Sequence, residues 1–439
     1  MIPPESTGLP AAGREPGAPP PRRAADLLRA LRVRNFALFW TGQLISGTGT
    51  WMQMVAMAWL VLDISGSAAV LGLVTTMQFL PLLMFVLPAG VLADRLPKRR
   101  IMLAAQALAT VQALLLGFLA LAGSPQIWQL AVLAFTLGVS NAFNNPAQQA
   151  FVPEMVGPTL VPDAVAMNSV QFNSSRMIGF ALGGLAVAHF SAAAVFFVNA
   201  ASFAAALGAL LALRSGELRV SMARPARHGA LREGLRYVLH TPDVLFVLAV
   251  LAVVGTFGYN WPVAAPLLAR DVLNVESVGF GALMSAFGAG SLVAGVGLVV
   301  IGGSNDRRMI TSGGVLALIL ILLGISRSYP VSLGLMVLAG LSGTVFTTTV
   351  NTRLQGLAPD RLRGRVMSLF VLLLAGTTPF GSALLGLGAE AFGVSATIIG
   401  FGVITVAGLA GLLVFRARKG RAVHRGAVPA RRHRGQRRA

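Results

Sequence analysis

The stretch from Ala68 to Arg100, AAVLGLVTTMQFLPLLMFVLPAGVLADRLPKRR, decides the fold. Its residues from Ala68 to Leu92 are uncharged and mostly apolar, and a charged segment follows at once. About 20 such residues, coiled as a helix, are long enough to cross a hydrocarbon layer of roughly 30 Å. The pattern therefore predicts a transmembrane helix that ends in a short charged loop.

The rest of the chain repeats this pattern. Of its 439 residues, 55% are hydrophobic and only 11% are charged, whereas a soluble domain carries about 25% charged residues. We therefore expect an all-α membrane protein with twelve transmembrane helices. The predicted spans are Phe36 to Leu62, Ala68 to Leu92, Ile101 to Leu121, Ile127 to Ala147, Met167 to His189, Ala192 to Leu213, Val244 to Leu268, Val278 to Ile301, Met309 to Ser326, Val331 to Val350, Val366 to Ala389 and Val394 to Phe415.

The positive residues predict the orientation, because loops rich in Lys and Arg stay on the cytoplasmic side. Of the 35 Lys and Arg residues, 32 fall on one side of the predicted topology. Arg270 and Arg327 lie on the other side, and Arg176 lies inside a span. We expect a multi-pass protein of a bacterial cytoplasmic membrane with both termini in the cytoplasm.

The polar segment 214–243 divides the spans six and six. We expect a disordered leader (1–35), a first half (36–213), a cytoplasmic loop (214–243), a second half (244–415) and a basic tail (416–439). The net charge of +20 could indicate a nucleic-acid partner, but topology and attraction to anionic headgroups already explain where the charges lie. The lipid bilayer is the expected partner, and nucleic acid is not.

The two halves share a spacing that indicates an internal repeat. Asn145, Gln149, Pro153 and Glu154 follow the fourth span, and Asn351, Gln355, Pro359 and Asp360 follow the tenth span at the same intervals. Repeated halves are typical of secondary transporters, which hold substrate between them. A weaker echo relates Gly90, Asp94 and Arg95 to Gly302, Asp306 and Arg307.

Gly90 to Arg100 resembles the loop signature between helices 2 and 3 of the major facilitator superfamily. Ser65 to Ala68, Asn145 to Ala147 and Pro359 to Arg365 resemble its bacterial exporter branch, which includes enterobactin exporters and macrolide efflux pumps. The similarity runs from about Phe36 to Phe415. It implies a secondary active exporter of drug, macrolide or siderophore-like amphiphiles that works by alternating access with protons as the coupling ion, and not an enzyme.

The same resemblance implies a gate at the charged loop, where the family's aspartate and arginines hold the halves together in the outward-facing state. The gating candidates are Gly90, Asp94, Arg95, Arg99, Arg100, Glu154, Asp360, Arg363 and Arg365. Glu154 is a candidate partner of Arg99 or Arg100. Asp94 is expected near Arg365, where the start of a helix favours an anion. The alternative is that these charges only set the topology.

Polar residues within the spans indicate a substrate cavity, because amides avoid lipid. On the first span Gln43, Ser46, Gly47, Thr50, Gln53, Met54 and Met57 share one helical face. In the family, helices 1, 4, 7 and 10 line the pathway; the alternative for this face is helix packing through Gly47. The remaining cavity candidates are Asn141, Asn144, Arg176, Tyr259, Asn260, Trp261 and Thr348. Pro262 and Pro266 are expected to kink the seventh span.

Arg176 is the one cation inside a predicted span, at a cost of roughly 2.5–3.5 kcal/mol on insertion scales. It either makes structural hydrogen bonds or attracts an anionic group of the substrate. Gly179, Gly183 and Gly184 after it resemble an antiporter motif, but Phe180 replaces the usual proline. No Asp or Glu is evident deep in a span, so proton coupling rests mainly on the resemblance.

We expect no catalytic residues, no cofactor and no metal site; the chain has no cysteine and no nucleotide-binding Walker sequence. An uptake permease is the nearest alternative to an exporter, and a sensor or scaffold that does not transport is the second. The sequence leaves the substrate, the coupling ion and the oligomeric state open.

Overall fold

The computed structural model describes residues 28–123, 125–219, 230–301 and 304–426. These residues are almost entirely helical and contain no strand. The main helices are α2 (Arg34–Ser65), α3 (Ala68–Arg95), α4 (Lys98–Leu121), α5 (Ile127–Val156), α6 (Val161–His189), α7 (Ala192–Leu211), α8 (Ala230–His240), α9 (Pro242–Gly258), α10 (Trp261–Leu267), α11 (Ser277–Ile301), α12 (Asp306–Ile325), α13 (Tyr329–Leu357), α14 (Asp360–Phe392) and α15 (Val394–Gly426).

Ten helical segments of the described residues are long and apolar enough to cross a membrane, with 242–272 counted as one segment. Two further helices, α2 and α6, are more polar but contain 32 and 29 residues, which is ample length for a span. Together they make twelve segments. The predicted all-α membrane fold is confirmed, and the helix number agrees with the prediction.

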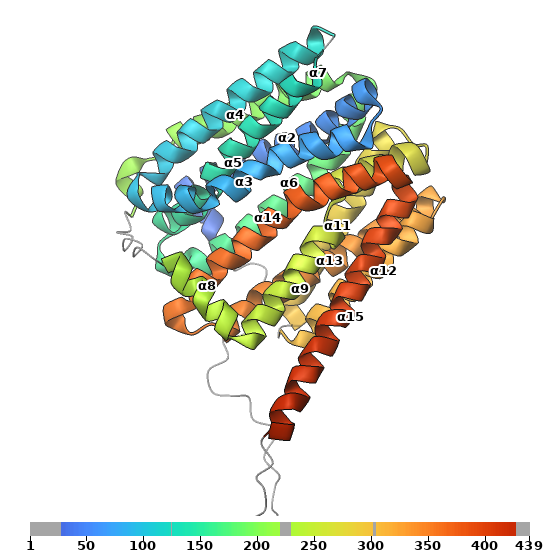
Figure 1. Cartoon of the computed structure of the whole chain (residues 1–439). Coiled ribbons are helices and arrows are strands. Elements are labelled where there is room, and N and C mark those ends of the chain that lie inside the picture. The colour runs from blue at the N-terminus through green and yellow to red at the C-terminus, as the bar shows by residue number, and fades with distance from the viewer. Residues whose placement is uncertain (1–27, 124, 220–229, 302–303, 427–439) are drawn as a thin grey trace, which may run out of the picture.

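The helices form two groups (Figure 1). Helices α2 to α7 pack against one another, chiefly through the pairs α2–α6, α2–α7, α3–α5 and α4–α7. Helices α9 to α15 pack in the same way, chiefly through α11–α13 and α12–α15. We call these sets the first group and the second group. The groups meet chiefly along two helix pairs, α3 with α14 and α6 with α11, and α10 adds smaller contacts with α2 and α3.

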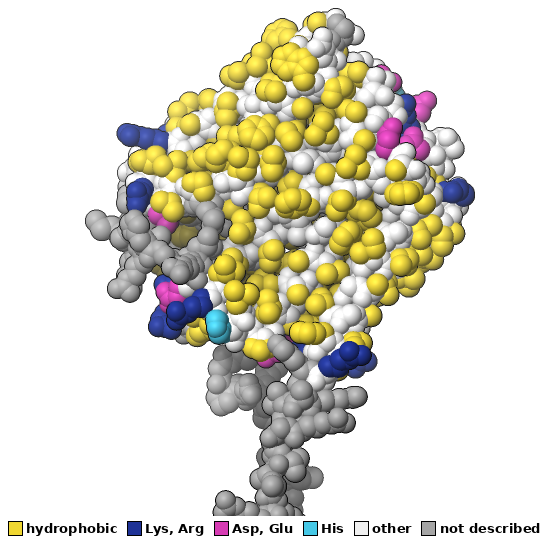
Figure 2. Space-filling view, viewed as in Figure 1, with side chains coloured by type: hydrophobic (Ala, Val, Ile, Leu, Met, Phe, Trp, Pro, Cys, Tyr) yellow, Lys and Arg dark blue, Asp and Glu magenta, His cyan; other side chains and the backbone are white. Residues whose placement is uncertain are grey.

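The two ends of the bundle differ in charge. Lys98, Arg214, Arg308 and Arg353 lie at or near helix termini at one end, which we call the basic end, and Arg416 of α15 reaches Asp243 and Asp306 at this end. In the face shown in Figure 2, hydrophobic side chains cover the middle of the helices, while charged side chains lie towards the ends. This distribution fits a protein with a lipid-covered belt, because an apolar face exposed to water would be unstable.

The helices extend beyond the predicted spans in several places. Helix α13 continues to Leu357, and α15 continues to Gly426, so the predicted basic tail begins as a helix. The predicted loop 214–243 contains α8, which buries Val238 and keeps Leu235 and Arg236 exposed. Most of the predicted leader and the last arginines of the tail lie outside the described residues. Solvated helix ends carry charges readily, so hydropathy alone underestimates their length.

Candidate functional site

Two glycine crossings join the groups at the end opposite the basic end. Where α6 crosses α11, a Cβ placed on Gly281 would lie 2.7 Å from the Phe180 carbonyl oxygen and 2.9 Å from the Gly184 Cα. Such distances are shorter than real Cβ contacts, so only glycine allows the backbones to approach this closely. The α6–α11 crossing is therefore a direct backbone contact between the groups.

The crossing of α3 and α14 repeats this geometry. A Cβ on Gly386 would lie 2.7 Å from the Ala68 carbonyl oxygen and 2.8 Å from the Gly72 Cα. In both crossings one glycine faces a carbonyl oxygen of the partner helix and a second glycine four residues further along that helix. Gly281 faces Phe180 and Gly184, and Gly386 faces Ala68 and Gly72. The two interfaces are thus alike, as expected if the groups arose from one duplicated unit.

Side-chain contacts reinforce this end of the bundle. The Glu390 carboxylate at the end of α14 accepts hydrogen bonds from the Ser67 hydroxyl at 2.9 Å and the Ala69 backbone N–H at 3.3 Å. It thereby places a negative charge at the N-terminus of α3, where the helix dipole favours it. Arg270 donates a hydrogen bond to the Leu62 carbonyl oxygen, again between the groups.

Contacts between the groups continue to the middle of the bundle. The Ser285 hydroxyl donates to the Met177 carbonyl oxygen at 3.1 Å, and a Cβ on Gly376 would meet the Leu83 side chain at 2.8 Å. Leu83 and Met177 lie near the middle of α3 and α6. These contacts between the groups therefore lie between the opposite end and the centre.

The seventh span breaks at this depth. Helix α9 ends at Gly258, Tyr259 and Asn260 have non-helical torsion angles, and α10 begins at Trp261. Pro262 lacks an N–H and cannot complete the helical hydrogen-bond pattern, so the predicted kink is an actual break. The Asn260 side-chain amide donates to the Thr256 carbonyl oxygen at 2.6 Å and so replaces one lost backbone bond.

The break brings predicted cavity residues to Arg176. The guanidinium carbon of Arg176 lies 5.2 Å from the Phe287 ring centroid and 5.7 Å from that of Phe172. Its side chain also interacts with Tyr259 and donates to the Asn173 side-chain oxygen at 2.8 Å. Two aromatic rings stabilise a desolvated cation through their negative faces. This arrangement joins α6 of the first group to α9–α11 of the second.

Other aromatic side chains extend this site. Trp261 packs on Phe287 with centroids 5.3 Å apart, and Tyr259 packs on the same ring at 6.1 Å. On the first group Trp51 packs on Phe172 at 5.6 Å. We call these residues, with Arg176, the Arg176 cluster. Phe172 is 51% exposed, so part of the cluster's apolar surface is accessible.

The polar face predicted on the first span lies against other helices of the first group and not in the Arg176 cluster. Gln53 is 2% exposed and hydrogen-bonds to Gln112 and Asn199, at 3.3 Å and 2.7 Å. The Gln43 backbone carbonyl oxygen accepts a hydrogen bond from the Gln171 side-chain amide at 2.9 Å. A Cβ on Gly47 would meet the Ser175 hydroxyl at 2.9 Å. These residues pack α2 against α4, α6 and α7, which is the alternative left open by the sequence.

The other cavity candidates stay apart from the cluster in the recorded contacts. Thr50 donates to the Ser46 carbonyl oxygen, and Met54 is buried in the core. On α5, Asn144 is buried and Asn141 half-buried. Thr348 is exposed on α13. Of the twelve predicted cavity residues, the structure gathers Arg176, Tyr259 and Trp261, with Asn260 at the adjoining break.

The charged loop at the basic end forms different pairs from those predicted. Glu154 pairs with Lys98, with Nζ and Oε1 2.9 Å apart and both side chains buried. Arg99 instead donates to the Leu210 carbonyl oxygen at 2.9 Å and the Ser215 hydroxyl at 2.6 Å. Successive residues of a helix point about 100° apart, so Lys98 faces α5 and Arg99 faces α7. In this conformation Glu154 therefore pairs with Lys98, and its pairing with Arg99 or Arg100 in the outward-facing state stays a prediction.

The predicted approach of Asp94 to Arg365 is likewise not found in this conformation. Arg365 pairs with Glu233 of α8, a partner that hydropathy assigned to a loop. Asp94 and Arg95 are exposed at the end of α3, and a Cβ on Gly90 would meet nothing within 4 Å. Arg100 is exposed at the rim of a groove lined by apolar residues of α3, α4 and α5.

The remaining gating candidates lie at the start of α14. The Arg363 Nε donates to the Gln355 carbonyl oxygen at 3.2 Å, which ties the beginning of α14 to the end of α13. Asp360 is the first residue of α14, and its side chain lies outside the described part of the structure.

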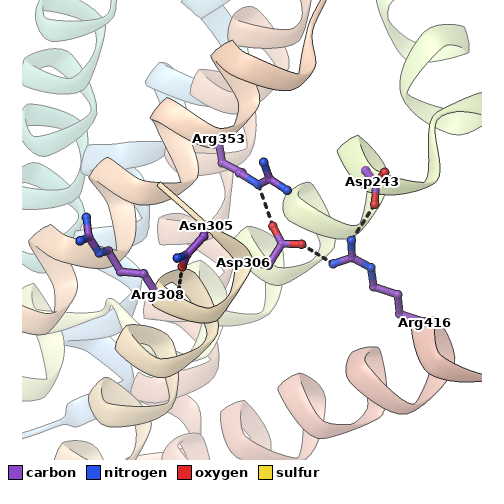
Figure 3. Close-up of polar contacts among 6 residues, drawn as sticks. All are labelled: Asp243, Asn305, Asp306, Arg308, Arg353 and Arg416. Atoms are coloured by element: carbon purple, nitrogen blue, oxygen red, sulfur yellow. Dashed lines mark hydrogen bonds and ion pairs between the residues drawn. The ribbon is translucent and has the colours of Figure 1, made fainter. Parts of the chain in front are cut away.

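The second group has a charge network at its basic end that sequence reasoning missed (Figure 3). Asp306 accepts from Arg353 at 2.8 Å and from Arg416 at 2.6 Å, and Arg416 also reaches Asp243 at 2.7 Å. The Asn305 side chain caps α12 by accepting from the Arg308 backbone N–H at 2.7 Å. The network connects α9, α12, α13 and α15, so these helices are held together at the basic end.

A sequence signal existed for only part of what was missed. Phe172 lies four residues before Arg176, so helical periodicity places the two on one face. Phe287 lies more than a hundred residues further along the chain, and no local pattern connects it with Arg176. The pairing of Asp306 with Arg416 is non-local in the same way. Contacts of this kind require the packed bundle.

Comparison with known proteins gives the family and the fold. A family model described as "Transmembrane secretion effector" matches residues 26–433. The chain is similar to the multidrug efflux pump Tap of Mycolicibacterium fortuitum, with 29% identity over 81% of this chain and 89% of that protein. It is 25% identical to the staphyloferrin A transporter of Staphylococcus aureus over 84% of this chain and 93% of that one. Macrolide efflux protein A of Streptococcus pyogenes is 26% identical to this chain, over 82% of this chain and 91% of that protein.

Solved structures share the fold. The POT family transporter PepTSo superposes with a TM-score of 0.72 at 11% identity, over 88% of this chain and 98% of that chain. A bacterial homologue of the human lysosomal transporter Spinster, in an inward-facing occupied conformation, gives a TM-score of 0.69 at 15% identity, over 88% and 96%. The resemblance noted in the sequence is thus confirmed at the level of fold.

Proposed function

The chain belongs to the transmembrane secretion effector family, within the major facilitator superfamily, and from this membership we propose that it exports amphiphilic small molecules by alternating access. The names of its relatives carry the proposal, because a multidrug pump, a macrolide efflux protein and a siderophore transporter match most of its length. The proposed substrate is a drug, macrolide or siderophore-like compound. No enzymatic step is involved.

We place the protein in the bacterial cytoplasmic membrane with its basic end and both termini in the cytoplasm. The support is the asymmetry of charge, because 32 of 35 Lys and Arg residues lie on one side of the topology and positively charged loops remain cytoplasmic. The glycine crossings then lie towards the outside. The described conformation is, on this proposal, the one that opens to the cytoplasm.

The two groups are the proposed moving bodies, with the boundaries 36–213 and 244–415. Each group is held together internally at the basic end, by Lys98–Glu154 in the first and by the Asp306 network in the second. The contacts between groups gather at the opposite end and the centre. A rocking motion that opens the opposite end would separate the crossings and bring the basic ends together, without disrupting either group.

The gate of the second conformation is proposed to use Asp94. Its carboxylate is exposed at the end of α3. Helix α3 is the helix of the first group that packs against α14 of the second group. The start of α14 offers unpaired backbone N–H groups, which favour an anion. We propose that Asp94 approaches this helix start when the basic end closes. Arg365 would then lie close enough to contribute.

Protons are the proposed coupling ion. The sequence has no Asp or Glu between Asp94 and Glu154, or between Asp306 and Asp360, so the exchangeable carboxylates lie at helix ends. The groups that change surroundings when the bundle rocks are Asp94 at the basic end and Glu390 at the opposite end. Proton coupling would therefore act through the gates and not through a carboxylate in the substrate cavity.

Transport assays in vesicles of opposite orientation test the proposal. Inverted and right-side-out vesicles containing the protein are incubated with lipophilic dyes, macrolides or siderophores, with and without an imposed pH gradient. Export predicts uptake into inverted vesicles that stops when the gradient is collapsed. Accumulation by right-side-out vesicles alone would indicate an uptake permease, and no movement of any compound by folded protein would favour a sensor or scaffold.

A further inference from the structure

Arg176 carries a buried charge that forms no ion pair with an acidic side chain among the described residues. It lies in the middle of α6 and is only 9% exposed. The sequence has no Asp or Glu between Asp163 and Glu217, a stretch that includes the rest of α6. It also has none between Glu276 and Asp306, a stretch that includes α11, the helix of Phe287. A cation at membrane depth ordinarily pairs with an anion. Within the described residues, the positive charge of Arg176 is therefore not compensated by a neighbouring carboxylate.

Hydrogen-bond donors around Arg176 are also left over. The Arg176 Nε and the Trp261 indole N–H are buried without a hydrogen-bond partner among the described residues. Buried donors are normally satisfied, so each unsatisfied one in a native structure calls for an explanation, such as a bound water, ion or ligand. Both side chains contact the ring of Phe287, as Tyr259 does. The Phe287 ring is thus contacted by a guanidinium group, an indole ring and a phenol ring.

The surroundings of these donors are apolar and aromatic. Phe172 contacts Arg176 and is half-exposed, and Trp51 packs against Phe172. A ligand that reaches Arg176 would therefore meet donors at one point and flat apolar surface beside it. Pockets of this composition orient a ligand by a few polar contacts and bind most of it by apolar contact.

We propose that the Arg176 cluster is a binding site for an anionic amphiphile, whose carboxylate or similar oxyanion is held by Arg176 while its apolar body packs on Phe172 and Trp51. The inference rests on the proposed exporter function and specifies the substrate class. Planar guanidinium groups match carboxylates with paired, charge-assisted hydrogen bonds. Because Arg176 comes from the first group and Trp261 and Tyr259 from the second, a bound anion contacts both groups.

A purely structural role for Arg176 is the competing explanation. Its contacts with two rings and with Asn173 stabilise the side chain without any ligand. That role predicts no preference for charge in a bound molecule, because the rings and the amide are already occupied. The two explanations therefore differ in the charge selectivity of binding and not in whether Arg176 matters for folding.

The test uses purified protein in lipid nanodiscs and pairs of ligands that differ only in charge. Indole-3-acetate, 1-naphthylacetate and dansylglycine are each compared with their neutral amides, and affinities are measured by equilibrium binding up to millimolar concentration. We expect at least one carboxylate to bind about tenfold or more tightly than its amide, because hydrogen bonds to charged groups are stronger than neutral ones. If no carboxylate binds, or if the amides bind equally well, the proposal is overturned.

Variants then assign the selectivity to Arg176. Arg176→Gln is expected to lose the preference for the carboxylate while retaining binding of the amide, and Arg176→Lys to retain part of it. Arg327→Gln removes one positive charge at the opposite end, where Arg327 is exposed and contacts Ser395, and should keep the full preference. Should Arg176→Gln fail to fold, Trp261→Phe removes the indole N–H and should weaken carboxylate binding selectively. A carboxylate preference that persists unchanged in folded Arg176→Gln, or in Trp261→Phe where Arg176→Gln does not fold, refutes the site.

The outcome is separable from that of the proposed function. If the protein transports neutral or cationic dyes in vesicles but shows no charge selectivity, export stands and the anion site falls. If it binds carboxylates selectively but moves nothing across the membrane, the site stands and the exporter proposal falls.

Discussion

Replacing Gly281 by alanine tests whether the crossing of α6 and α11 stabilises the conformation that is closed at the end opposite the basic end. An added Cβ would lie 2.7 Å from the Phe180 carbonyl oxygen, which falls 0.7 Å short of the 3.4 Å at which ordinary contacts begin. The atoms in conflict belong to backbone on both sides. The strain can therefore be relieved only if the two helices move apart.

The magnitude follows from the cost of overpacking, about 1–3 kcal/mol for an extra methyl group in a tight contact. The substitution also favours the helix by roughly 1 kcal/mol, but it does so in both conformations and leaves their ratio unchanged. The ratio of closed to open forms at this end should fall by about 5- to 150-fold, because 1.4 kcal/mol corresponds to a factor of ten.

Distance measurements between spin labels provide the assay. The chain has no cysteine, so labels can be attached without removing native residues. Leu121 and Ile325, exposed ends of α4 and α12 in different groups, report the opposite end. Leu96 and Gln355, also exposed, report the basic end. Gly281→Ala should lengthen the first distance and shorten the second.

Gly295 supplies the matched control, because it lies on the same helix and a Cβ there meets nothing within 4 Å. Gly295→Ala should leave both distance distributions at their wild-type values. If folded Gly281→Ala protein keeps the wild-type distribution at both ends, the crossing does not control the equilibrium and the reasoning fails.

Three further results are expected. Removing one partner of the buried Lys98–Glu154 pair, by Lys98→Met or Glu154→Leu, should lower the free energy of unfolding by roughly 3–5 kcal/mol, and the double substitution should restore most of this loss. Apparent melting temperatures in detergent measure the effect. Equal losses in the single and double variants would contradict the expectation. Asp94→Asn should melt like the wild type, because the carboxylate is exposed, but should reduce transport in vesicles; normal transport at equal abundance would leave Asp94 with a topological role alone. Reporter domains fused at Met1 and Ala439 should both be cytoplasmic, and an external reporter at either end would reject the proposed orientation.

The fold was predictable because membrane insertion depends on local properties. An apolar run of sufficient length must become a helix, since lipid offers no hydrogen-bond partner to the backbone. Pro262 likewise acts locally, and the break after Gly258 lies where its missing N–H predicts it. The helix ends were less predictable, because α8 and the last turns of α15 lie beyond the apolar runs and depend on charge and amphipathicity.

The candidate site was only partly predictable, because a polar face on a helix does not identify its neighbour. Gln53 was placed on a cavity-lining face, yet its amide bonds to Gln112 and Asn199 within the first group. Arg176 was found for a different reason: a charge inside a span must have a partner wherever it points. Its partners, Phe287 and Tyr259, come from the other group and could be identified only from the structure.

Residues that occupy matching positions in the two halves of the repeat do not make matching contacts. By spacing, Asp94 matches Asp306, but Asp306 is held by Arg353 and Arg416 while Asp94 is exposed. A carboxylate already bound by two guanidinium groups gains little from a new partner, whereas an exposed one can gain a full contact. If one gate forms when the basic end closes, the first group must therefore supply the mobile charge and the second group the rigid surface that receives it.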